Sequence, residues 1–185
     1  MKRGDCVDKL TDEKKYIYLG IPVLFLAGSL FHFLYDLTGQ LTIIGAISPV
    51  NESVWEHCKM VVLPTILWWT IYYIAMAKKK GIDKNKWFTA ALSSLVVSII
   101  TIPFIFYFYT NAFGIESLVV DIMILLIAVT LGQLAGFHIF VFGKGINAKI
   151  SIALIIAILI IFIVFTFSTP HLPIFLDKST GSYGI

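Results

Sequence analysis

The stretch that decides the fold is ISIALIIAILIIFIVFTFS, at residues 150–168. It carries no charge and consists almost entirely of Ile, Leu, Val, Ala and Phe. Because a helix rises 1.5 Å per residue, about 20 apolar residues cross the ~30 Å hydrocarbon core of a bilayer. This stretch therefore predicts a membrane-spanning helix.

The whole chain shares this apolar character. Of its 185 residues, 58% are apolar and 14% are charged, and the mean hydropathy is +0.91. Ordinary soluble domains carry roughly 45–50% apolar and about 25% charged residues, so the composition argues against a soluble globule. A net charge of +3 makes no phosphate-binding stripe, which argues against nucleic acid as a partner. The expected partner is the lipid bilayer.

Five apolar runs are long enough to cross a membrane, and we predict an all-α, polytopic membrane protein. A β-barrel would instead show alternating segments of about ten residues. The predicted transmembrane domain covers residues 16–168 and follows a tail at 1–15. Its spans are expected at about 16–37, 53–77, 87–109, 116–142 and 150–168.

One further apolar segment, LTIIGAISPV at 41–50, is too short to cross. Short runs of this kind lie at the membrane interface or re-enter the membrane where protein or a wet cavity covers them. We predict a short interfacial or re-entrant helix here, and the sequence leaves both forms open.

The basic residues set the expected orientation. Twelve of the 14 Lys and Arg residues fall in the tail and in the loops after the second and fourth spans. The other side has only Lys59 and Lys178. By the positive-inside rule, the N-terminus is cytoplasmic and the C-terminus lies outside the plasma membrane.

The segment after the fifth span, residues 169–185, is expected to form an outer cap. Two prolines end the helix, since proline donates no backbone N–H. The segment has only two charges, Asp177 and Lys178, and several large apolar residues, unlike a disordered tail. We expect it to fold back across the outer mouth with His171, and Asp177 as a second candidate, pointing inward. The alternative is a tail that lies loosely in the headgroup region.

Acids and histidines gather on the predicted outer side. Six of the 11 acids and three of the four histidines fall there, against two basic residues. The side chains of such a set repel one another unless a metal ion, protons or a cationic substrate binds among them. Imidazole and carboxylate are ligand types that zinc and other divalent metals accept. The predicted metal ligands are His32, Asp36, His57, Asp121 and His171, and the predicted catalytic residues are Glu52 and Glu56.

Spacing supports this polar layer. His32 and Asp36 are four residues apart and share a helix face, with His32 about 8 Å deep at 1.5 Å per residue. Glu52 and Glu56 share a face at the start of the second span. Plainer interpretations stay open: Glu56 completes a capping box with Ser53, Asp36 ends its helix, and His32 holds a neighbouring helix by a hydrogen bond.

The blocks PVNESVWEH (49–57) and TPHLPIFLDKSTGSYGI (169–185) resemble a family of small bacterial membrane proteins that carries a domain-of-unknown-function label. This resemblance covers the whole chain and implies a membership without an activity. A weaker resemblance, in Ser29-Leu-Phe-His32 with Asp36, is to the zinc-dependent intramembrane hydrolases of the alkaline ceramidase and adiponectin-receptor superfamily. That superfamily has seven spans and a late H-x-x-x-H pair, whereas this chain has five predicted spans and a single His171 there.

Three classes of function fit these residues. The first is a metal-dependent hydrolase of a lipid-like ester or amide, with zinc or another divalent metal as cofactor and Glu52 or Glu56 as general base. The second is a transporter or channel for a proton, metal ion or small cation. The third is a non-enzymatic membrane subunit or scaffold whose polar layer holds helices together. The sequence names no substrate and no oligomeric state.

Overall fold

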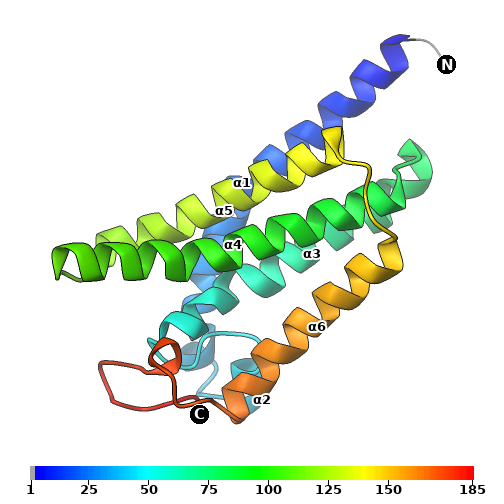
Figure 1. Ribbon diagram of the computed structural model, residues 1–185. Helices are drawn as coiled ribbons and strands as arrows, with labels where there is room; N and C mark the ends of the chain where they lie inside the picture. The colour runs from blue at the N-terminus through cyan, green and yellow to red at the C-terminus, as the bar shows by residue number, and fades with distance from the viewer. Residues whose placement is uncertain (1–2) are drawn as a thin grey trace.

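The computed structural model describes residues 3–185, with side chains from Asp12 onward. Its helices are α1 (Arg3–Leu37), α2 (Thr42–Gly45), α3 (Val54–Lys80), α4 (Lys84–Phe113), α5 (Leu118–Phe142) and α6 (Ala148–Phe167), followed by the 3-10 turn η1 (Pro173–Phe175) (Figure 1). The described residues contain no β-strand, only an isolated bridge between Leu176 and Tyr183. The all-α prediction is confirmed. The expectations for Met1, Lys2 and the basic side chains before residue 12 lie outside the described part.

Five of the helices are long and apolar enough to cross a membrane, as expected for a multi-pass membrane protein. The qualifying segments are Asp12–Leu37, Val54–Lys80, Lys84–Phe113, Leu118–Phe142 and Ala148–Phe167. Between the first two lies α2, a single turn that occupies residues 42–45 of the short apolar segment. The five long helices and the short one reproduce the predicted architecture.

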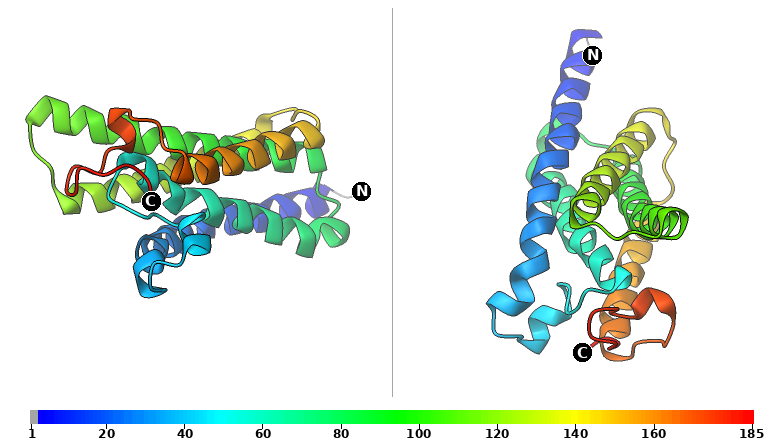
Figure 2. Two further views of the ribbon diagram at one scale, coloured as in Figure 1. Left: turned by 90° about the horizontal axis from the view of Figure 1, so that it is seen from below. Right: turned by 90° about the vertical axis from the view of Figure 1, so that its left-hand side faces the viewer.

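The helices α1, α3, α4 and α5 form a bundle, and α6 lies on its flank (Figures 1 and 2). α5 packs against α4 and α1, α3 packs against the same two helices, and α6 packs mainly on α4. Small residues permit close approach, since a Cβ added to Gly132 of α5 would lie 2.0 Å from Oγ of Ser98 on α4. Within a bilayer, such packing replaces the hydrophobic effect as the force that joins helices.

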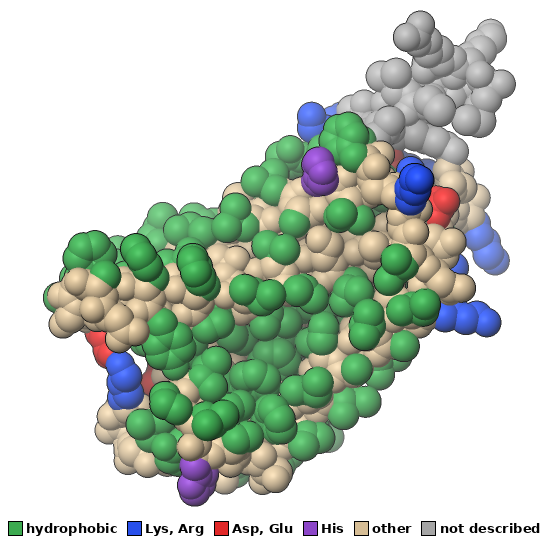
Figure 3. Space-filling model, in the orientation of Figure 1, with side chains coloured by type: hydrophobic (Ala, Val, Ile, Leu, Met, Phe, Trp, Pro, Cys, Tyr) green, Lys and Arg blue, Asp and Glu red, His purple; other side chains and the backbone are tan. Residues whose placement is uncertain are grey.

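The two ends of the bundle differ in their charged residues. Figure 3 shows hydrophobic side chains along the flank and Lys or Arg side chains gathered toward one end. The lysine end, where α3 finishes and α4 begins, carries Lys78, Lys79, Lys80, Lys84 and Lys86. The histidine end, where α1 finishes and α3 begins, carries His32 and His57. An apolar flank between two polar ends matches the layers of a bilayer.

The loop before α3 is organised by hydrogen bonds to its own backbone. Ser53 is the N-cap of α3, and its hydroxyl accepts from the Glu56 amide at 3.3 Å. The Ser53 amide donates to the side-chain oxygen of Asn51 at 3.0 Å. The Glu56 carboxylate instead accepts from the Val50 amide at 3.1 Å. The helix thus begins where the capping pattern predicts, with only one half of a capping box.

The C-terminal segment, residues 169–185, folds back over the histidine end (Figure 1). Phe175 is buried, and its ring lies 4.7 Å from the indole of Trp55 at the start of α3. The Ile185 amide donates to the Thr166 carbonyl at the end of α6. The segment therefore packs on the first turn of α3 and on the last turn of α6.

Candidate metal centre

Three side chains meet at the histidine end. Nε2 of His32 lies 3.5 Å from Oε1 of Glu52, and Nε2 of His57 lies 3.3 Å from Oε2 of the same carboxylate. One ligand atom from each residue lies within 4.8 Å of the other two. Two ligands held about 2.0–2.1 Å from one tetrahedral metal are roughly 3.3 Å apart, so the two nitrogen–oxygen separations suit a shared ion.

Each of these residues comes from a different element. His32 lies in the last turns of α1, where the ring of Phe33 packs edge-on at 4.9 Å. His57 lies in the first turn of α3, and its amide donates to the Ser53 carbonyl at 3.1 Å. Glu52 lies in the loop between α2 and α3. Two helices therefore fix the imidazoles, and the loop brings the carboxylate between them.

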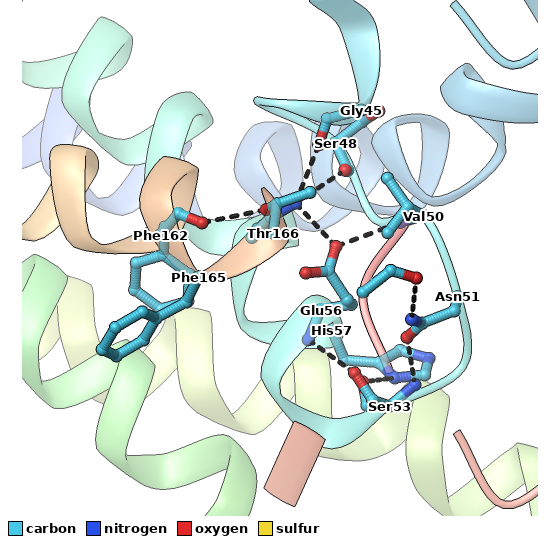
Figure 4. A network of polar contacts seen from close by, with 12 residues as sticks. Gly45, Ser48, Val50, Asn51, Ser53, Glu56, His57, Phe162, Phe165 and Thr166 are labelled. Atoms are coloured by element: carbon cyan, nitrogen blue, oxygen red, sulfur yellow. Dashed lines mark hydrogen bonds and ion pairs between the residues drawn. The ribbon is translucent and has the colours of Figure 1, made fainter. Parts of the chain in front are cut away.

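A hydrogen bond on Nδ1 of His57 determines what its Nε2 can do. Nδ1 lies 2.9 Å from the carbonyl oxygen of Ser53 (Figure 4). A carbonyl oxygen only accepts, so Nδ1 carries a proton. In the neutral ring, Nε2 is then an acceptor directed at the Glu52 carboxylate, which also only accepts. This contact requires a second proton on His57 or a cation shared by both groups.

The same hydrogen bond is typical of metal-binding histidines. A ligating imidazole usually donates its other N–H to a carboxylate, a backbone carbonyl or water, which fixes the tautomer and the orientation of the ring. Ser53 supplies that acceptor to His57 from the N-cap of the same helix. The donor set and its supporting contact thus fit a divalent ion bound by two imidazoles and one carboxylate.

The electrostatics of Glu52 suit a ligand that must be ionised. The hydrogen bond from His57 holds the pKa of Glu52 below its usual value, and the charges of His57 and His32 act in the same direction, against partial burial and the Asp177 carboxylate. The Glu52 side chain is 57% exposed, whereas His32 and His57 are 23% and 29% exposed. The Glu52 carboxylate is therefore open to solvent, and the two imidazoles are partly so.

Glu56, the other predicted catalytic carboxylate, is buried and has a different partner. Its Oε2 lies 2.6 Å from Nζ of Lys59, and both side chains are 2% exposed. Thr166 of α6 lies beside the pair (Figure 4). Among the described side chains, the group within ligand distance of His32 and His57 contains Glu52 and not Glu56.

The remaining predicted ligands also lie outside that group. Asp36 is exposed one turn beyond His32. Asp121 accepts a hydrogen bond from the Tyr109 hydroxyl at 2.7 Å. His171 is exposed on the C-terminal segment. The structure thus brings together one predicted catalytic residue and two of the five predicted metal ligands.

Sequence analysis missed the partners of Lys59, whereas it expected Asp177 to point inward with His171. Asp177 is buried, and its carboxylate accepts from the Ser179 amide at 2.8 Å. Burial raises its pKa, but hydrogen bonds from Ser179, Thr180 and the backbone of Glu52 lower that pKa overall. The sequence signal for the Lys59 partner is its spacing of three residues from Glu56, which is typical of a helix ion pair.

Comparison with known proteins identifies a family and no activity. The profile of a family of unknown function (DUF6512) matches residues 6–185, which is nearly the whole chain. No curated protein and no solved structure matches the sequence.

Proposed function

We propose that this chain, which belongs to the family of unknown function DUF6512, is a multi-pass membrane hydrolase with a divalent metal bound by His32, Glu52 and His57. The observation that carries this proposal is the approach of two Nε2 atoms to one carboxylate, at 3.5 and 3.3 Å. Three protein ligands with an accessible fourth position are the usual arrangement of catalytic zinc.

The chemistry follows from the ligand set. A metal held here would polarise an ester or amide carbonyl and acidify a bound water. His32, Glu52 and His57 would hold the metal, and the Glu52 carboxylate would accept a proton from the attacking water. The water oxygen would bond to the carbonyl carbon, the carbon–oxygen or carbon–nitrogen bond would break, and the proton would pass from Glu52 to the leaving group.

The surroundings of the site favour an amphiphilic substrate. Large apolar side chains are exposed beside it, on α1 at Phe33 and Leu37 and around α2 at Leu41 and Ile43. Such side chains lie in hydrocarbon, whereas the exposed Glu52 carboxylate needs a polar layer. The site then lies at the level of lipid headgroups, where the ester and amide bonds of lipids also lie. We place this level at the outer leaflet of the plasma membrane, with the N-terminus cytoplasmic.

Metal analysis tests the proposal directly. Full-length protein purified in detergent with Zn²⁺ and washed free of excess metal should retain about one ion per chain. His32→Ala and His57→Ala should lose it. His138→Ala and His171→Ala are matched controls that remove exposed histidines elsewhere and should keep the ion. A metal-free wild-type protein would overturn the proposal and leave the Glu52–His57 contact as a structural link between the loop and α3.

Hydrolysis requires a separate measurement. Zinc-loaded protein in mixed micelles should release fatty acid from ester- or amide-linked lipids, and a chelator should stop the release until Zn²⁺ is restored. Glu52→Gln should abolish turnover. Stable zinc binding without release from either lipid class would support a metal-binding scaffold and reject the hydrolase.

A further inference from the structure

The buried ammonium of Lys59 is tied to the loop that carries Glu52. Its Nζ donates to the Gly45 carbonyl at 2.8 Å and to the Ser48 carbonyl at 3.2 Å, and it lies 2.6 Å from the Glu56 carboxylate. Figure 4 labels these three partners. An ammonium has three N–H donors, so all of them have partners here. One side chain of α3 thereby holds two backbone positions at the end of α2.

Glu56 extends this attachment by two residues. The same oxygen that faces Lys59 accepts from the Val50 amide at 3.1 Å. The Lys59–Glu56 pair therefore holds the backbone at Gly45, Ser48 and Val50. Glu52 follows only two residues later, so its position depends on where this backbone lies.

Glu52 is the only member of the three-residue group that no helix carries. His32 and His57 keep their places through α1 and α3, whereas a loop residue needs support from outside. The loop is also attached to the C-terminal segment, because the side chain of Asn51 donates to the Gly184 carbonyl at 3.1 Å. A catalytic ligand must be held within about 0.5 Å of its productive position, which a free loop does not achieve.

Burial of the pair is poor evidence for a purely stabilising role. Removing two charges from water costs about as much as their attraction returns, and apolar replacements of a buried pair are often neutral or stabilising. Hydrogen bonds between such a pair and three backbone groups of one loop instead hold that loop in one position. Apolar side chains could fill the space, but they could not hold two carbonyls and one amide.

We infer that Lys59, together with Glu56, is a positioning residue that places the Glu52 carboxylate between His32 and His57. This inference rests on the proposed metal site. Lys59 and Glu56 touch neither metal nor substrate, and they act through the backbone of residues 45–50.

The test measures Zn²⁺ affinity by competition with a chromophoric chelator, on full-length protein in detergent. The double variant Glu56→Gln/Lys59→Met removes both charges at nearly constant volume. We expect its affinity to fall about 10–100-fold, the usual effect of losing a supporting contact. Glu56→Gln alone keeps an acceptor for the Val50 amide but leaves the buried Lys59 ammonium without a counter-charge, so its affinity should fall as well. The visible spectrum of bound Co²⁺ should change in the double variant.

Tyr109→Phe is the control for a general loss of stability. It breaks a polar contact at the same end of the bundle, to Asp121, without touching the loop. Its Zn²⁺ affinity and Co²⁺ spectrum should equal those of wild type. A folded double variant with wild-type affinity and spectrum would overturn the positioning role. If the wild-type protein does not bind Zn²⁺, the proposed function is overturned instead.

Hydrogen exchange on the wild type keeps the inference testable if the double variant does not fold. When Zn²⁺ binds Glu52, the loop should open less often, so the Val50 amide should exchange more slowly than in metal-free protein. If Zn²⁺ binds but the exchange rate of the Val50 amide does not change, the coupling between the Lys59–Glu56 pair and the site is rejected.

Discussion

The imidazole rings of His32 and His57 stack with their centroids 5.3 Å apart and their planes 22° from parallel. One ring lies near the end of α1 and the other in the first turn of α3. This stacking places both Nε2 atoms beside the single carboxylate of Glu52. The stacked rings and the carboxylate thus join α1, α3 and the loop before α3 at one point.

In metal-free buffer, Glu52→Gln should reduce the loss of melting temperature that accompanies a fall in pH. The pKa of Glu52 is lowered in the folded state from a reference value of 4.5, mainly by the His57 hydrogen bond. Its contribution is therefore present above the unfolded-state pKa and is lost as the pH falls through the lower folded-state pKa. Wild type should lose more melting temperature than Glu52→Gln between about pH 5 and 3, by a small amount because the carboxylate is exposed. Equal losses would contradict the assignment.

Tyr109→Phe should destabilise the protein by about 1–3 kcal/mol, the cost of leaving a polar group without its partner. The hydroxyl donates to Asp121 at 2.7 Å and accepts from the Ser117 amide at 3.3 Å, which joins the end of α4 to the start of α5. Unfolding in mixed micelles measures the effect. Tyr107→Phe is the matched control, because the buried Tyr107 hydroxyl has no partner among the described residues. Equal effects of the two variants would rule out this account.

Phe175→Ala should lower the free energy of unfolding by about 3–5 kcal/mol, as expected for removal of a buried aromatic ring. Phe175 is 4% exposed and holds the C-terminal segment against Trp55. Leu172→Ala in the same segment removes a side chain that is 55% exposed and should have little effect. Thermal unfolding of both variants in detergent provides the comparison. A stable Phe175→Ala protein would mean that the segment is held mainly by its hydrogen bonds.

The orientation is tested by labelling single cysteines in intact cells, after Cys6 and Cys58 are replaced by alanine. A cysteine at Ser182 should react with an impermeant reagent, and one at Lys79 should react only after permeabilisation. The partition of the lysines and arginines predicts this difference. Labelling of both positions from the same side would reject the five-span topology with opposite ends.

The sequence was sufficient to predict the helices because their causes are local. A bilayer requires a run of about 20 apolar residues for each span, and hydropathy along the chain shows where these runs lie. The beginning of α3 follows from Ser53, whose hydroxyl caps the helix three residues before Glu56. The same patterns predict similar depths for His32, Glu52 and His57, which makes them candidates for one layer.

Depth alone does not decide which side chains meet. A residue on a helix also has a direction around the helix axis, and that direction is set by packing against other helices. Asp121 therefore contacts Tyr109, although its predicted depth is similar to that of His32. For Glu56, the decisive factor is the loop, because the backbone at Gly45, Ser48 and Val50 surrounds the Lys59–Glu56 pair. The sequence by itself determined the long apolar helices, whereas only the tertiary structure placed Glu52 between two histidines, since helix packing and loop position arise from contacts between residues distant in the chain.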